Sequence, residues 1–272
     1  MGWVHDWACP VVTGWRTPVV IGVSLKMYFD PERTIEYCTA VAALARRHEA
    51  IISGRVSLFV MPTFLSLASA IDIFDGAAVE VGAQDLFWED RGAFTGEISG
   101  ADLRALGCRY VELGHAERRE LFGEGDSVVQ RKLAAALRNG LRPVLCVGEP
   151  HEGKPAAAAA RCIDQLNAVL AGIDTVARQS TLIIAYEPVW AIGAVQSASV
   201  EHVTAVTALL REWLGGQPGL EASRVIYGGS AGPGLLSTLN GAVDGLFLGR
   251  FAHDPGSLER ILDEAMMAPE LL

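Results

Sequence analysis

The segment AYEPVWAIG, residues 185–193, joins a strand pattern to a loop and decides how the rest of the chain is interpreted. Residues 181–186 form an apolar run of strand length, and Pro188 ends the ladder because it has no N–H to donate. Glu187 therefore stands at the end of a buried strand, beside a loop with hinge-like ends and small residues between them. This arrangement is typical of a catalytic base under a lid, although a solvated acid at a strand end is the simpler alternative.

The same alternation of apolar strand pattern and helical pattern occurs eight times from Pro18 onward. The runs are nearly continuous in apolar residues, as expected for strands covered on both faces; they span residues 19–25, 56–61, 79–83, 110–113, 143–147, 182–186, 225–227 and 245–248. The helical patterns span roughly residues 31–49, 64–72, 99–106, 126–139, 155–177, 199–214, 233–239 and 256–266. Eight such units predict one α/β domain, a closed (β/α)8 barrel over residues 18–272, with an open doubly wound sheet as the alternative.

Composition excludes several classes of partner. The formal net charge of −10 argues against nucleic acid and anionic membrane surfaces, and no apolar run reaches membrane-spanning length. The five cysteines are scattered without metal-ligand spacing, so we expect no metal site, no disulfide framework and a cytoplasmic location. Residues 1–17 lack the pattern of a secretory signal and are expected to be an N-terminal extension without an assigned function.

Functional residues of (β/α)8 barrels lie at the carboxyl ends of the strands, and several chemically capable side chains follow the predicted strands here. Lys26, His115 and Glu187 would converge on one mouth of the barrel. Taken singly, Lys26 is equally consistent with a solvated charge and His115 with a helix cap. Glycine-containing turns after strands seven and eight, at Gly228 and Gly249, can expose N–H groups to a phosphate.

Six segments resemble the triosephosphate isomerase family closely, in order, over about residues 19–265. They are KM (26–27), GAFTGEIS (92–99), ELGHAERR (112–119), CVGE (146–149), AYEPVWAIG (185–193) and YGGS (227–230). The resemblance implies a TIM barrel, a small anionic sugar phosphate as substrate, and isomerisation through an enediolate without a metal or an organic cofactor. Its simplest form is the conversion of D-glyceraldehyde 3-phosphate to dihydroxyacetone phosphate in glycolysis and gluconeogenesis.

The resemblance also implies a role for each matching residue. Glu187 resembles the base that moves a proton between neighbouring carbons, and His115 the neutral imidazole that polarises the carbonyl oxygen. Lys26 resembles the cation that attracts substrate, and Glu117 a group that positions Lys26 and His115. The residues expected to bind substrate, mostly through its phosphate, are Ser24, Gly193, Gly229, Ser230, Gly249 and Arg250.

The sequence departs from the common family pattern at four places. Ser24 replaces Asn, Ala116 replaces Ser, residues 193–196 read GAVQ in place of GTGK, and Arg250 replaces the second Gly of a pair. The changes at Ser24 and Ala116 would make room near the reacting carbons. Members of the family that interconvert L-erythrulose 1-phosphate and D-erythrulose 4-phosphate in tetritol breakdown are therefore the alternative, because their substrate carries one more hydroxymethyl group. Arg250 would add a contact to phosphate or point away from the site.

The family is usually dimeric, and the segment after the third strand reaches into the partner. Here the segment from Gln84 to Thr95 is long and carries Phe87, Trp88 and Phe94, so we expect a homodimer. The alternative is that these aromatic side chains cover the barrel's own surface. A barrel that binds a sugar phosphate or a protein without catalysis is a further alternative, against which the joint presence of Lys26, His115 and Glu187 argues.

Overall fold

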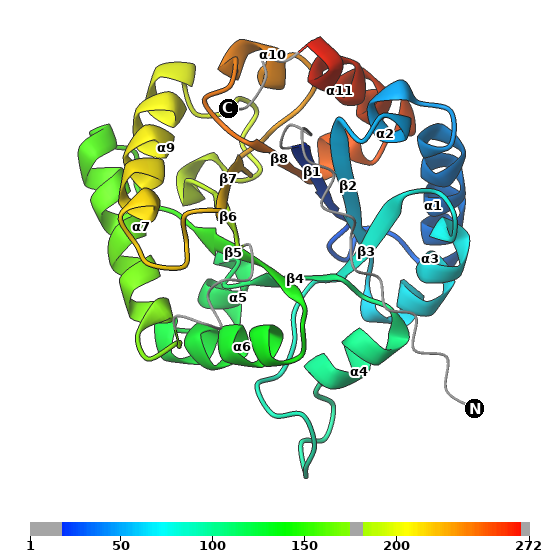
Figure 1. Ribbon diagram of the computed structural model, residues 1–272, viewed down its shortest axis with the longest axis horizontal. Coiled ribbons are helices and arrows are strands. Elements are labelled where there is room, and N and C mark those ends of the chain that lie inside the picture. The colour runs from blue at the N-terminus through cyan, green and yellow to red at the C-terminus, as the bar shows by residue number, and fades with distance from the viewer. Residues whose placement is uncertain (1–17, 175–181, 268–272) are drawn as a thin grey trace.

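The strands form a closed barrel in a computed structural model that describes residues 18–174 and 182–267. Within those residues eight parallel strands pair in chain order and β8 pairs with β1, which closes the barrel and rules out an open sheet (Figure 1). The strands are β1 (Val19–Ser24), β2 (Val56–Met61), β3 (Val79–Ala83), β4 (Tyr110–Leu113), β5 (Arg142–Val147), β6 (Ile183–Tyr186), β7 (Arg224–Tyr227) and β8 (Gly245–Leu248). The predicted extension at residues 1–17 lies outside the described residues.

Helices surround the barrel and cover the outer face of its strands (Figure 1). They are α1 (Pro31–Ala45), α2 (Glu49–Ile52), α3 (Leu67–Phe74), α4 (Gly100–Leu106), α5 (Ala116–Leu121), α6 (Asp126–Arg138), α7 (Pro155–Leu170), α9 (Val200–Gly215), α10 (Leu235–Leu239) and α11 (Pro255–Met267). Three 3₁₀ helices are η1 (Phe64–Ser66), η2 (Val189–Ala191) and η3 (Arg250–Ala252). The helices predicted over residues 31–49 and 64–72 each divide in two, into α1 and α2 and into η1 and α3, and α5 is an additional short helix. Four strands differ from the prediction by one residue at one end: β1, β5, β6 and β7. The last residues of the helix predicted over 155–177 lie outside the described residues.

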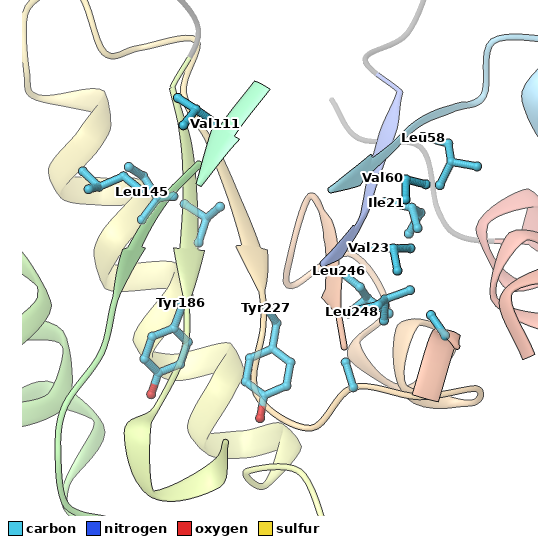
Figure 2. Packing of buried hydrophobic residues seen from close by; sticks show 14 of the residues in the cluster. Ile21, Val23, Leu58, Val60, Val111, Leu145, Tyr186, Tyr227, Leu246 and Leu248 are labelled. Atoms are coloured by element: carbon cyan, nitrogen blue, oxygen red, sulfur yellow. The ribbon is translucent and has the colours of Figure 1, made fainter. Parts of the chain in front are cut away.

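Side chains alternate along each strand between two buried cores, because successive residues of a strand point to opposite faces. The outer core fills the space between strands and helices; Figure 2 shows 14 of its members and labels ten, among them Ile21, Val23, Tyr186 and Tyr227. The inner core fills the barrel itself and includes Val20, Tyr110, Cys146, Ile183 and Phe247. The inward positions of β1 and β4 therefore continue to Ser24 and Glu112 at the carboxyl ends of these strands.

The amino-terminal end of the barrel interior is closed by a polar cluster, which we call the lower cluster: Ser57, Glu80, Tyr110 and Arg142. The Tyr110 hydroxyl donates to Glu80 Oε2 at 3.0 Å and lies 3.4 Å from Ser57 Oγ. Arg142 Nη1 donates to Glu80 Oε2 at 3.2 Å and to Tyr110 Oη at 3.1 Å. Each member thus has a partner within the cluster, which is partly exposed at this end of the barrel.

The segment from Gln84 to Thr95 leaves the barrel after β3 and projects beyond the ring of helices before α4 (Figure 1). Its aromatic side chains behave differently from one another. Phe87 is buried and Trp88 packs against the outer core, whereas Phe94 is 41% exposed. Phe87 and Trp88 therefore cover the chain's own surface, as the alternative prediction held, and the partly exposed Phe94 ring lies with its centroid 4.7 Å from that of Phe87.

The described residues contain no helix long and apolar enough to cross a membrane. The described cysteines, Cys38, Cys108, Cys146 and Cys162, are buried with free thiols. In the same part of the chain, His, Cys, Asp and Glu form no group of three or more with the arrangement of a metal site.

Candidate active site

A cavity of about 180 Å³ opens at the carboxyl ends of the strands, and the predicted catalytic side chains meet in it. Lys26 follows β1, His115 and Glu117 follow β4, and Glu187 follows β6; all four line the cavity. Residues far apart in sequence thus converge because parallel strands end at the same rim of the barrel.

Glu187 is buried and tightly surrounded by backbone. A Cβ atom added at Gly228 would lie 2.4 Å from Glu187 Oε1, and one at Gly148 would lie 1.9 Å from the Glu187 carbonyl oxygen. The two glycines are therefore required for the position of this carboxylate, not only for tight turns. Burial, and after it the negative charge of Glu112, raises the pKa of Glu187 to about 8, so its carboxylate is a stronger base than an ordinary glutamate.

His115 caps the amino terminus of α5 and faces Glu187 at the same time. Its Nδ1 accepts a hydrogen bond from the Glu117 backbone N–H at 3.1 Å, so in the neutral ring the proton resides on Nε2. That Nε2 lies 3.5 Å from Glu187 Oε2. Burial and the nearby charge of Lys26 lower the pKa of His115 to about 4, which keeps the imidazole neutral near pH 7.

Lys26 holds its side chain in the cavity from a strained backbone. Its φ of +46° lies in the left-handed region, which costs a non-glycine residue about 1 kcal/mol or more. Its ammonium group donates to Glu117 Oε1 at 2.6 Å. Burial opposes the positive charge, but the hydrogen bond and charge of Glu117 outweigh it and raise the pKa of Lys26, so the cation persists.

The arginines of the ELGHAERR segment anchor α5 from behind. Arg119 Nε donates to the Gly114 carbonyl oxygen at 2.8 Å, and its Nη1 lies 2.6 Å from Asp126. Arg118 pairs with Glu124. These contacts fix the short helix whose first turn carries Glu117 and whose cap is His115.

The loop after Glu187 rests on the β7 and β8 loops, and its residues Ile192 and Gly193 line the cavity. Its first hinge is held by Trp190, whose Nε1 donates to Glu149 Oε1 at 2.8 Å. Its second hinge is held by the Tyr227 hydroxyl, which accepts the Ala198 N–H at 3.0 Å. At the tip, Ser230 Oγ donates to the Ala194 carbonyl oxygen at 2.9 Å. These bonds tie the loop to the β5 and β7 ends of the barrel.

Most predicted binding residues line the cavity, with two differences. Ser24, Gly193, Ser230, Gly249 and Arg250 line it; Gly229 does not, and its missing side chain instead leaves space for the Tyr227 hydroxyl. Ala116 lines a neighbouring cavity, so of the two smaller side chains only Ser24 borders the space beside Lys26.

The sequence prediction missed Glu112, a buried carboxyl group in the same cavity. Its strand was interpreted as nearly continuous in apolar residues and not as alternating. The period of two along β4, with Tyr110 pointing inward, would have placed Glu112 inside the barrel and towards the site.

A buried carboxylate, a neutral imidazole that presents N–H, and an ammonium group can together move a proton between carbons next to a carbonyl and neutralise the charge that develops. This combination at the mouth of a (β/α)8 barrel defines a class of proton-transfer isomerases.

Comparison with known proteins agrees with that class. The family model described as triosephosphate isomerase matches residues 19–265. The chain is 50% identical to L-erythrulose-1-phosphate isomerase of Pectobacterium atrosepticum, over 91% of this chain and 95% of that protein. It is 39% identical to L-erythrulose-1-phosphate isomerase of Rhizobium etli, over 90% of each chain, and 38% identical to triosephosphate isomerase of Moorella thermoacetica, over 91% of this chain and 98% of that protein. The chain therefore belongs to the triosephosphate isomerase family and is a cofactor-independent sugar-phosphate isomerase.

Proposed function

We propose that this protein interconverts L-erythrulose 1-phosphate and D-erythrulose 4-phosphate. The observation that carries the proposal is the 50% identity to a relative named for the first of these compounds, compared with 38% for the triosephosphate isomerase of Moorella thermoacetica. Of the two substrates that the sequence suggests, a triose phosphate and a tetrulose phosphate, these identities favour the tetrulose phosphate. Ser24, smaller than the Asn common in the family, borders the cavity and supports a larger substrate.

In this proposal Glu187 removes the proton from C3 of L-erythrulose 1-phosphate, and an enediolate spans C2 and C3. The same carboxylic acid returns the proton to C2, while the neutral His115 transfers the hydroxyl proton from O3 to O2, so the carbonyl moves from C2 to C3. No atom is gained or lost. The raised pKa of Glu187 and the lowered pKa of His115 suit these two roles. Lys26 offsets the negative charge of the enediolate, and Glu117 positions Lys26.

The phosphate is proposed to lie against the β7 and β8 loops and the tip of the lid, where Gly193, Ser230 and Gly249 line the cavity. Arg250 supplies a positive charge there, and its Nη2 lies 3.4 Å from the Gly193 carbonyl oxygen. A guanidinium group in that position can bind phosphate and hold the lid together. We also propose a cytoplasmic homodimer formed through the segment from Gln84 to Thr95, in which Phe94 is partly exposed.

The test is a side-by-side measurement of kcat/KM for D-erythrulose 4-phosphate and D-glyceraldehyde 3-phosphate with the purified protein. We expect the tetrulose phosphate to be preferred by about 100-fold, within the range by which shape and hydrogen bonding separate such similar substrates. A preference for the triose phosphate would overturn the proposal and make this an ordinary triosephosphate isomerase.

A further inference from the structure

Glu112 is a buried carboxyl group in the cavity that the proposed reaction does not use. It lies near the end of β4, its side chain is 4% exposed, and it lines the same cavity as Glu187 and Ser24. A buried carboxyl group without an ion pair costs stability.

The contacts of Glu112 leave one oxygen available to a ligand. Its Oε2 accepts a hydrogen bond from Ser24 Oγ at 3.0 Å. The nearest cation, Lys26, donates to Glu117 instead. Among the residues that the structure describes, none donates to Glu112 Oε1. Burial raises the pKa of Glu112 to about 7, so near neutral pH it can either accept or donate a hydrogen bond.

The place of Glu112 in the barrel determines which part of a substrate it faces. In the closed order β1 to β8, strand β4 lies across the barrel from β8, whose loop carries Gly249 and Arg250. His115, which would bind the carbonyl oxygen, follows Glu112 by three residues. A substrate with its phosphate beside Arg250 would therefore direct its far end, beyond the reacting carbons, towards Glu112, which the Ser24 side chain reaches from β1 through its hydrogen bond.

We propose that Glu112 and Ser24 form the binding site for the terminal hydroxymethyl group of the four-carbon substrate, which makes them specificity-determining residues. This inference rests on the proposed function. The O–H of the hydroxymethyl group matches the acceptor Glu112 Oε1, while the Ser24 hydroxyl donates to Glu112 Oε2 and holds the carboxyl group in that position. A triose phosphate carries only hydrogen at that place and leaves the carboxyl group unpaired, and sites built to bind a hydroxyl group discriminate strongly against substrates that lack it.

A role of Glu112 through Glu187 makes a different prediction. Its charge raises the pKa of the proposed base, and this effect acts on every substrate alike. The quantity that separates the two roles is therefore the ratio of kcat/KM for D-erythrulose 4-phosphate to that for D-glyceraldehyde 3-phosphate, because a change in the base cancels in this ratio.

The experiment compares the wild type with Glu112→Val and Glu112→Gln. Valine suits a strand, and retained inhibition by phosphoglycolate shows that the variant still forms the site. We expect Glu112→Val to lower the ratio by about 100-fold, and Glu112→Gln to lower it by about 10-fold or less because the amide still forms hydrogen bonds. The matched control is Glu80→Gln, another inward glutamate bonded to a hydroxyl group, at the opposite end of the barrel; its ratio should equal that of the wild type.

An equal loss of kcat/KM for both substrates in Glu112→Val would overturn the inference and leave Glu112 as a group that acts on Glu187. The wild type distinguishes this failure from that of the proposed function. A wild type that prefers the tetrulose phosphate, with an unchanged ratio in Glu112→Val, refutes only the inference. A wild type that does not turn over the tetrulose phosphate refutes both.

Discussion

The two ends of the barrel interior use similar polar side chains in opposite ways. At the amino-terminal end, Glu80 accepts from both Tyr110 and Arg142 in the lower cluster. At the carboxyl end, no hydrogen bond reaches Glu187 Oε2 from the described part of the chain, and Lys26 has a strained backbone. The lower cluster contributes to stability. The carboxyl end retains groups that cost stability, Glu187 and Lys26, as expected where side chains are positioned to bind a substrate.

Substitutions at the two ends of the barrel should differ most in their effect on kcat. Glu187→Gln should lower kcat by about 10³–10⁴-fold, because an amide cannot accept a proton from carbon. Its matched control, Glu80→Gln, removes the charge of a glutamate inside the same barrel and should change kcat by less than about 2-fold. Steady-state kinetics on both variants tests this contrast. Comparable activity in Glu187→Gln and the wild type would refute the assignment of the base.

The same two substitutions should change stability in opposite directions. The folded-state pKa of Glu187, about 8, lies above its unfolded value near 4.5, so ionisation opposes folding increasingly as pH rises between these values. Glu187→Gln should therefore have a higher free energy of unfolding than the wild type, by about 1–3 kcal/mol at pH 8.5 and by less at pH 5.5. Glu80→Gln should lose about 1 kcal/mol. Urea unfolding at both pH values measures the contrast; a destabilised Glu187→Gln at pH 8.5 would contradict it.

A smaller effect is the influence of Glu112 on the pKa of Glu187, the other carboxyl group at the carboxyl end of the barrel. The rate should fall below about pH 8 as Glu187 becomes protonated, while His115, with its pKa near 4, adds no further change above pH 5. Because Glu112 raises the pKa of Glu187, Glu112→Gln should shift this acidic limb of the kcat/KM profile to lower pH. Protonation of the substrate phosphate would give a limb at the same pH in both proteins, so an unshifted limb would contradict the coupling.

The barrel was predictable from sequence because its strands are buried on both faces and stand out as short apolar runs. The short helix α5 was not, because its six residues, AERREL, show no apolar periodicity and depend on the His115 cap and the arginine anchors. Among site residues, Lys26, His115, Glu117 and Glu187 come together as predicted.

The remaining site residues depend on details that the linear pattern does not carry. Gly229 leaves space for the Tyr227 hydroxyl and does not line the substrate cavity. Ala116 borders the neighbouring cavity. Whether each of these two residues borders the substrate cavity depends on where its loop turns after the strand. Glu112 was missed for a different reason, since its inward direction follows from the alternation along β4.

The most direct test of the account is proton exchange at the substrate carbon. The wild type would be incubated with D-erythrulose 4-phosphate in D₂O and followed by ¹H NMR. We expect L-erythrulose 1-phosphate to appear and deuterium to replace the proton on the carbon between the carbonyl and the phosphate-bearing carbon, with neither change in Glu187→Gln. Binding of phosphoglycolate without exchange or product in the wild type would contradict the account and indicate a barrel that binds sugar phosphates without converting them.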